Sequence, residues 1–169
     1  MRSPTTTLNE RYSVSNATPA TWDETRRVIE TAQLFWISTV GTDGRPHVTP
    51  LVAVWDEGAL HFNTSHGSQK EINLRSNRHV TLTTGSSESE SGFDVVVEGD
   101  GVRVVDDGTL HRLASAWATK WNGVWKFGVL DGCFVAPDGQ VGVLVFSVSP
   151  KKVFTFRRGE SMGQTRHVF

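Results

Sequence analysis

Residues 62–70, Phe62-Asn63-Thr64-Ser65-His66-Gly67-Ser68-Gln69-Lys70, join the end of a strand-like run to the start of a short polar helix. Free backbone amides and the dipole at a helix N-terminus favour a bound anion. The hydroxyls of Thr64, Ser65 and Ser68 can add hydrogen-bond donors, and Lys70 adds a positive charge. The spacing of a P-loop is absent. From the residues alone, the segment is either a phosphate-binding turn or an ordinary turn with a helix cap.

Upstream of this segment the sequence predicts one helix and three strands. Thr21-Trp22-Asp23-Glu24 has the form of a capping box, so we expect a helix over about residues 22–33. β-Branched and aromatic residues, separated by turn-forming residues, then predict strands over 34–40, 47–55 and 59–64. Pro50 lies inside the second strand and favours a sheet edge or a bulge there. An interrupted ladder would leave backbone groups free for a ligand.

Downstream, the pattern continues with strands and two helices. A brief helix is expected over 67–76, a strand over 79–84, and an exposed, mobile loop over the low-complexity residues 85–92. Further strands are expected over 93–99 and 102–105, and again over 141–148 and 152–156 around a break at Ser149-Pro150. The clearest helix covers 107–122, because its apolar residues recur on one face: Leu110, Leu113, Ala114, Trp117 and Trp121.

The order of these elements predicts the fold class. Neighbouring strands are joined by short turns and do not alternate with helices, which favours an antiparallel sheet or barrel over parallel units. We therefore expect a mainly β domain with a few helices over residues 21–169. Residues 1–20 are rich in Thr, Ser, Asn and Pro, so we expect a flexible tail there.

Composition and charge argue against several functions. The 17 basic and 18 acidic residues give a formal charge of −1, without the basic surface of a nucleic-acid-binding protein or the polybasic segment of a membrane-binding one. The six histidines lack metal-ligand spacing, so no metal site is expected. No long apolar run or signal-peptide core is present, and the single cysteine, Cys133, excludes an internal disulfide. We expect a cytoplasmic protein.

The motif Thr64-x-x-Gly67-Ser68-x-Lys70 between a strand and a helix resembles the cofactor segment of the pyridoxamine 5′-phosphate oxidase-like superfamily. This is the split β-barrel family of flavin and deazaflavin (F420) oxidoreductases. The resemblance extends over about residues 22–169 and includes further motifs in the same order: Gly41-Thr42-Asp43-Gly44-Arg45-Pro46, Pro50, Val97-Glu98-Gly99 and Trp125-Lys126-Phe127. The ending, residues 164–169, resembles actinobacterial members grouped with F420 enzymes. The resemblance implies a six-stranded antiparallel split β-barrel and a homodimer with cofactor sites at the interface.

The resemblance also implies roles for individual residues. In the family, the second strand lays its backbone along the flavin ring, which here means Thr49, Pro50, Leu51 and Val52. Asn63 and Thr64 match positions that flank the ring and the phosphate. Ser68 and Lys70 match phosphate ligands, and Ser65 and Gln69 lie in the same loop. No catalytic side chain is implied, because the cofactor supplies the chemistry.

Two other residues each have two interpretations. Trp125 follows the predicted helix 107–122, so its ring could stack on a cofactor or could simply pack in the core or at an interface. Arg166 could be a solvated residue near the C-terminus. In the resembled family, however, the C-terminal segment can reach a cofactor pocket, which would make Arg166 a cofactor ligand.

The chain departs from the oxidases of vitamin B6 metabolism at three places. Gln69 replaces an arginine before the lysine, Phe93-Asp94 replaces Arg-Gln, and the Arg-Leu-x-Pro ending is replaced by residues 166–169. These departures argue against oxidation of pyridoxamine phosphate, and the lost arginine favours F420 over FMN.

The expected function is therefore an oxidoreductase that moves a hydride between F420 or FMN and a small organic substrate. Three alternatives remain at this point. The first is an FMN-dependent enzyme closer to pyridoxamine phosphate oxidase. The second is a non-catalytic protein that binds flavin, F420 or haem, and the third is a β-barrel interaction module without a cofactor.

Overall fold

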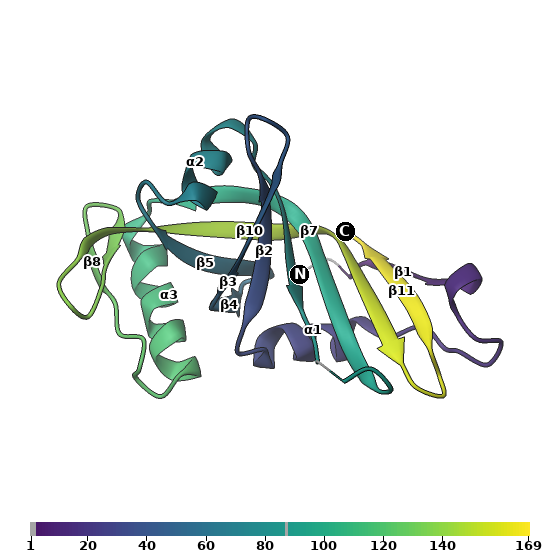
Figure 1. The fold of residues 1–169 in the computed structure, drawn as a ribbon. Coiled ribbons are helices and arrows are strands. Elements are labelled where there is room, and N and C mark those ends of the chain that lie inside the picture. The colour runs from purple at the N-terminus through teal and green to yellow at the C-terminus, as the bar shows by residue number, and fades with distance from the viewer. Residues whose placement is uncertain (1–2, 87) are drawn as a thin grey trace.

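The computed structural model describes residues 3–86 and 88–169, so Ser87, within the expected loop 85–92, lies outside the described residues. Figure 1 shows a curved sheet with α3 and β8 at one end and η1, β1 and β11 at the other. The helices are α1 (Trp22–Thr31), α2 (Gln69–Ser76) and α3 (Asp107–Lys120), with a short 3-10 helix, η1 (Glu10–Tyr12). The strands are β1 (Thr5–Asn9), β2 (Phe35–Val40), β3 (Pro46–Leu51), β4 (Ala53–Asp56), β5 (Ala59–Ser65), β6 (His79–Thr84), β7 (Gly92–Val104), β8 (Gly128–Leu130), β9 (Cys133–Val135), β10 (Val141–Arg158) and β11 (Gly163–Val168).

The sheet is antiparallel at every described strand pair. Its main path runs β1-β11-β10-β7-β6-β2-β3, and β10 also pairs with β5, which carries β4 on its other side. The strands β3 and β4 follow one another in the chain but pair with different neighbours, β2 and β5. The sheet therefore curls, so that the part that ends in β3 and the part that ends in β4 come together at Val52, the residue that joins these two strands. The predicted mainly β, antiparallel fold class is confirmed.

The strand count differs from the predicted six. The sheet has eleven strands among the described residues. The difference arises because β1, β8, β9 and β11 were not predicted and because the expected second strand divides into β3 and β4. Two predicted breaks are also absent. β7 is one strand of 13 residues, and β10 is one strand of 18 residues. The ladder between β10 and β7 shifts register between Pro150 and Lys152, so a bulge accommodates the proline without ending the strand.

The N-terminal segment differs from the expected flexible tail. Residues 5–9 form β1, which pairs along its whole length with β11. His167 of β11 is fully buried beneath it. One ring nitrogen of His167 lies 2.9 Å from the hydroxyl of Thr6, and the other lies 3.0 Å from that of Thr25 in α1. These long-range contacts order the segment.

Two hydrophobic clusters form the core. One lies inside the curled sheet and includes Phe35, Leu60 and Phe62. The other lies between α3 and strands β4, β9 and β10 and includes Trp117 and Phe134. Burying each such side chain contributes about 1.5–3 kcal/mol. The clusters hold the β3–β4 break, the end of β5 and the loop after α3 in fixed relation, and the candidate site lies among these segments.

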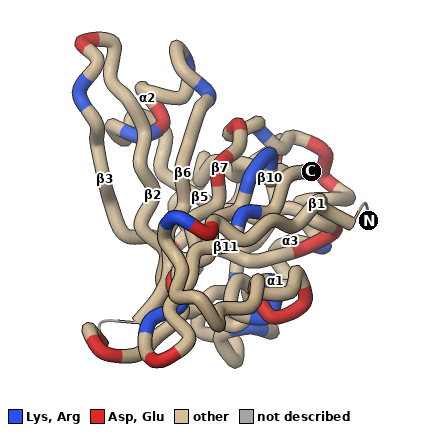
Figure 2. The backbone as a smooth tube through the Cα atoms, turned by 90° about the vertical axis from the view of Figure 1, so that its right-hand side faces the viewer, with Lys and Arg blue, Asp and Glu red and all other residues tan. Residues whose placement is uncertain are grey.

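The helix starts agree with the local sequence signals. Thr21 and Glu24 form the predicted capping box at α1, and Asp106 caps α3 through a hydrogen bond from the amide of Thr109. No helix of the described residues is long and apolar enough to cross a membrane. Figure 2 shows basic and acidic residues interspersed along the chain.

Candidate cofactor site

A cavity of about 480 Å³ opens where the β3–β4 break, the end of β5, the start of α2 and the loop after α3 meet. Its volume falls in the range of about 300–1,000 Å³ that is common for small-molecule sites. Its lining residues come from these segments, from the residue before β2, from the β9–β10 connection and from the start of β10: Leu34, Pro50, Leu51, Val52, Asn63, Thr64, Ser65, Ser68, Lys70, Trp125, Phe127, Ala136, Gln140 and Val143.

Hydroxyl groups and one amine form the polar end of this cavity. The hydroxyls of Thr64 and Ser68 lie 2.8 Å apart, and the amine of Lys70 donates to the Thr64 hydroxyl at 3.3 Å. Ser68 is the N-cap of α2, but its side chain makes no capping hydrogen bond. The amides of the first turn of α2 also lack acceptors within the helix. The polar end of the cavity therefore presents donors to an anion.

The backbone of the turn allows this arrangement. Gly67 has a φ of 77°, in the left-handed region that glycine adopts without strain. Its amide donates to Glu71 at 3.0 Å. Arg75 in turn binds both carboxylate oxygens of Glu71 at 2.7 Å, and this interaction is the main cause that lowers the pKa of Glu71. The carboxylate of Glu71 is thus neutralised by Arg75.

Lys70 has no such counter-charge. Within the described residues it forms no ion pair with a carboxylate, and burial lowers the pKa of Lys70 below its usual value. A half-buried ammonium group that meets only a hydroxyl is poorly compensated, since a charge removed from water needs a partner. An anion in the cavity would supply that partner.

Asn63 provides a second, independent sign of a ligand. Its side-chain nitrogen is buried and has no hydrogen-bond partner among the described residues, although Asn63 lines the cavity. A buried donor without a partner costs about 1–3 kcal/mol. A ligand with a hydrogen-bond acceptor beside Asn63 would remove this cost.

Aromatic rings form the opposite wall. The rings of Trp125 and Phe127 stack, with centroids 6.1 Å apart and an interplanar angle of 19°. Phe127 also stacks on Phe134 at 4.7 Å and meets Trp117 edge-on at 6.2 Å. Phe127 is therefore fixed by the core, whereas Trp125 is 36% exposed and presents part of its ring at the rim.

Lys120 lies behind the β3–β4 break and was not predicted to have a role. Its amine donates to the carbonyl of Ala53 at 2.9 Å and lies 4.9 Å from the ring centroid of Trp121. Burial lowers the pKa of Lys120 to about 8. The bond ties the end of α3 to the first residue of β4, next to Val52 in the cavity wall. Sequence alone indicated only a basic residue in the last turn of a helix.

The structure brings together most of the residues predicted for the site: Pro50, Leu51, Val52, Asn63, Thr64, Ser65, Ser68, Lys70 and Trp125. Thr49, Gln69 and Arg166 do not line this cavity. Thr49 lies beside Ile37 of β2. Gln69 donates to Asn73 one turn further along α2, at 2.9 Å. Arg166 lines a separate hollow with Phe154, on β11 and β10.

Several lining residues were not among those predicted from the sequence: Leu34, Phe127, Ala136, Gln140 and Val143. Phe127 belongs to the Trp125-Lys126-Phe127 motif and could have been included from its position. Val143 reaches the cavity because β10 pairs with the end of β5, with Val143 opposite Ser65. This pairing joins residues far apart in the chain, so no local pattern indicates it.

Comparisons with known proteins agree with this architecture. Residues 21–156 match the family model for pyridoxamine 5′-phosphate oxidase. No curated protein matches the chain significantly in sequence. Several solved structures share the fold at low sequence identity.

One is a conserved hypothetical protein from Mycobacterium tuberculosis, with a TM-score of 0.69 and 19% identity over 85% of this chain and 88% of that one. An FAD-binding protein from Mycobacterium smegmatis has a TM-score of 0.59 and 18% identity, covering 82% of this chain and 97% of its own. A protein described as an F420 reductase has a TM-score of 0.54 and 18% identity, covering 76% and 94%. Haem-binding proteins of the same fold also match.

Proposed function

The chain belongs to the pyridoxamine 5′-phosphate oxidase family, and on this basis we propose that it is an oxidoreductase that uses F420 or FMN in the cavity described above. The bound cofactor would supply hydride chemistry toward a small organic substrate. The observation that carries the proposal is Lys70, a half-buried cation without a carboxylate partner among the described residues. It stands beside two hydroxyls and a helix N-terminus, the donor set that binds phosphate.

The residues of the cavity fit such a cofactor. Thr64, Ser68 and Lys70 would hold the phosphate, and the unpartnered amide nitrogen of Asn63 would donate to an acceptor of the ring or the chain attached to it. The segment Pro50–Val52 and the ring of Trp125 would flank the flat ring system. Flavin-type rings suit this wall because it combines apolar side chains with unpaired backbone groups of an edge strand.

The protein's own contribution is position and exclusion of water. In the part of the chain that the structure describes, the cavity lining contains no His, Cys, Asp or Glu, so it supplies no general acid or base of these types. Hydride transfer to or from a bound ring requires none. Apolar side chains such as Leu51, Phe127 and Val143 line the cavity and would shield a bound ring from water.

At the phosphate group itself, a single positive charge suits the phosphodiester of F420 better than the phosphate monoester of FMN. Gln69 stands where the family has a basic residue and donates to Asn73, which leaves Lys70 as the one cation in the cavity lining among the described residues. FMN carries a phosphate monoester, with a charge of about −1.5 to −2 at pH 7. F420 carries a phosphodiester with a single charge, which one lysine and two hydroxyls compensate more completely.

A non-catalytic carrier of the same cofactor is the main alternative, because it would use the same cavity. Haem fits the lining less well. Haem iron is held by a His, Cys, Met or Tyr side chain, and none of these lines the cavity within residues 3–86 and 88–169. A protein that only carries the cofactor would bind it without turning over any substrate.

We further propose a homodimer whose interface closes the cavity. Trp36 and Val48 are 50% and 51% exposed on neighbouring strands β2 and β3, and Pro50 lies opposite Trp36 in the ladder. Exposed apolar side chains grouped in this way mark an interaction surface. The surface continues into the cavity through Pro50 and Leu34, so a second copy seated there would cover the cofactor.

The proposal is tested by titrating the purified protein with F420 and with FMN, followed by fluorescence. We expect saturable binding of both, tighter for F420, and oxidation of reduced F420 in the presence of a suitable acceptor from a panel of quinones and nitroaromatic compounds. Binding without turnover across the panel would support the carrier. If the protein binds neither cofactor, the proposal is wrong.

A further inference from the structure

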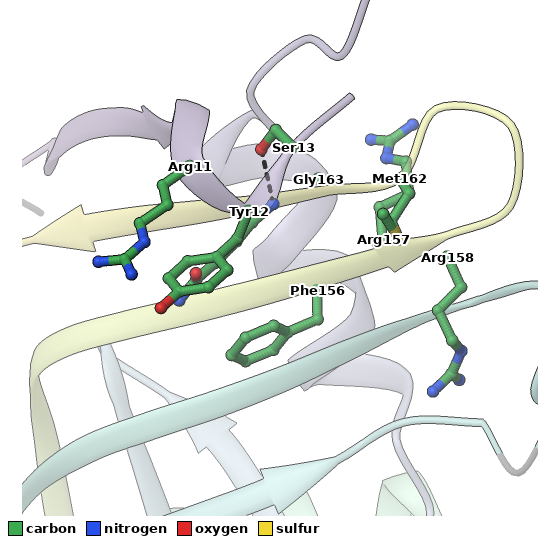
Figure 3. A pocket seen from close by; sticks show the side chains of 9 residues that line it. Arg11, Tyr12, Ser13, Phe156, Arg157, Arg158, Met162 and Gly163 are labelled. Carbon is green, nitrogen blue, oxygen red and sulfur yellow. Dashed lines mark hydrogen bonds between the residues drawn. The ribbon is translucent and has the colours of Figure 1, made fainter. Parts of the chain in front are cut away.

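A second cavity, of about 690 Å³, lies at the opposite end of the sheet from α3 and β8 (Figure 1). Figure 3 shows its lining, which comes from η1 and the residue after it, the end of β10, the β10–β11 turn and the start of β11. None of these residues lines the candidate cofactor cavity. Its volume lies within the range of small-molecule sites.

Three apolar side chains wall this second cavity. Tyr12, Phe156 and Met162 are 57%, 38% and 48% exposed, and they come from three different segments (Figure 3). Large apolar side chains that gather at the surface mark a site that a ligand or partner covers. Single exposed residues would need no explanation, but here they share one hollow.

The charged groups around the cavity are not equivalent. Arg157 pairs with Glu24 at 3.2 Å, and Arg158 pairs with Asp94. Arg11 forms no ion pair among the described residues, and its guanidinium lies 5.6 Å from the ring centroid of Tyr12. Of these three guanidinium groups, Arg11 therefore carries a charge that no carboxylate of the described chain balances.

The other polar groups are mostly donors. The Ser13 hydroxyl is already used, because it donates to the carbonyl of Asn9 at 2.8 Å and accepts from the amide of Gln164 at 3.1 Å. The side-chain oxygen of Gln164 accepts from Asn9 at 3.2 Å, which leaves its NH₂ group as a donor. With Arg11 and the Tyr12 hydroxyl, the cavity combines donors with an apolar wall.

We propose that this cavity binds an amphipathic organic anion, an aromatic or acyl carboxylate, with its apolar body between Tyr12, Phe156 and Met162 and its charge at Arg11. Arg11 is positive and the free polar groups donate hydrogen bonds, so the site is complementary in charge to an anion. A neighbouring hollow of about 400 Å³ shares Arg11 and Gln164 and is also lined by Glu10 and Arg166.

The test uses two fluorescent probes with the same rings, anilinonaphthalene sulfonate, which is an anion, and phenylnaphthylamine, which is neutral. We expect Arg11→Gln to weaken binding of the anionic probe about fivefold and to leave the neutral probe unchanged. Phe156→Ser should weaken both. Arg45→Gln is the matched control, because Arg45 is 88% exposed in the turn between β2 and β3, and it should change neither.

Two results would overturn the proposal. In the first, Lys70→Ala abolishes binding of the anionic probe while Arg11→Gln leaves that binding unchanged, which would place the probe in the cofactor cavity. The second is a homodimer, seen by sedimentation, that Phe156→Ser converts to a monomer, which would assign the hollow to a second copy of the chain. Circular dichroism of each variant verifies that it is folded.

Discussion

The amine of Lys70 donates a 3.3 Å hydrogen bond to the hydroxyl of Thr64, across the turn that joins β5 to α2. The two side chains come from different elements and meet at the wall of one cavity. The contact orients the ammonium group but leaves its charge unbalanced.

Lys70→Ala should weaken cofactor binding by about 1.5–3 kcal/mol, the value of a charge-assisted hydrogen bond. The melting temperature of the cofactor-free protein should hardly change, because the lysine forms no ion pair in the described chain. Fluorescence titration and thermal unfolding measure the two quantities. Lys126→Ala, at an exposed residue of the loop after α3, is the control and should alter neither.

Asn63→Leu should raise the stability of the cofactor-free protein by about 1 kcal/mol while it weakens cofactor binding. The reason is that the substitution removes a buried donor without a partner, which only a ligand would satisfy. Urea unfolding and titration measure the two effects. Lower stability together with unchanged affinity would show that Asn63 has a structural role only.

Thr49→Val is the matched comparison for Asn63. The Thr49 hydroxyl is also buried without a partner, but Thr49 does not line the cavity. The variant should therefore be at least as stable as the wild type and should bind the cofactor equally well. Weaker binding would return Thr49 to the site predicted from the sequence.

Alanine substitutions of the stacked residues Trp125 and Phe127 should differ in effect: the first should weaken cofactor binding and the second should lower the stability of the fold. Trp125→Ala should cost about 0.5–1.5 kcal/mol in cofactor binding and little stability, because its ring is at the rim. Phe127→Ala should destabilise the protein by about 3–5 kcal/mol, since Phe127 packs on Phe134 and Trp117. Equal destabilisation by both variants would place Trp125 in the core.

The stability of the protein should fall as the pH is lowered from 7 to 5, and His167 should contribute to this fall. The Thr25 hydroxyl donates to the carbonyl of Thr21, so it accepts from His167, whose other nitrogen accepts from Thr6. This network holds a neutral ring, and burial lowers the pKa of His167 below its usual value.

Because the unfolded chain takes up the proton near pH 6.5 and the folded chain does not, stability is lost below that pH, by up to about 1.4 kcal/mol per pH unit for each such histidine. Burial lowers the pKa of His61 in the same direction. Urea unfolding at pH 7.5 and 5.5 measures the loss, which should be smaller in His167→Gln. An equal loss in wild type and variant would exclude His167 as a contributor.

Local signals predicted the parts of the fold that depend on near neighbours. The capping box at Thr21 and Glu24 and the apolar face of α3 need only adjacent turns of helix. Pro50 correctly pointed to a sheet edge, since β3 ends the main path of the described sheet. These features follow from the chain's own stereochemistry.

The parts that were missed depend on distant pairing. β1 exists because β11, at the other end of the chain, pairs with it. Pro150 does not end β10, because a bulge absorbs it. Arg166 was predicted for the cofactor site by resemblance. The pairing of β11 with β10 places it beside Phe154, outside the lining of that cavity. Side-chain position in a sheet follows register, and register is set by partners that no local window contains.

The most direct test compares the affinity for each cofactor with the affinity for an analogue that lacks the phosphate, in the wild type and in Lys70→Ala. The pairs are FMN with riboflavin, and F420 with the deazaflavin alcohol that has the same ring. The wild type should bind the phosphate-bearing form about 10- to 100-fold more tightly, and the variant should lose most of this preference, as expected for a direct contact. An equal preference in both proteins would contradict the assignment of Lys70 and the β5–α2 turn as the phosphate-binding site.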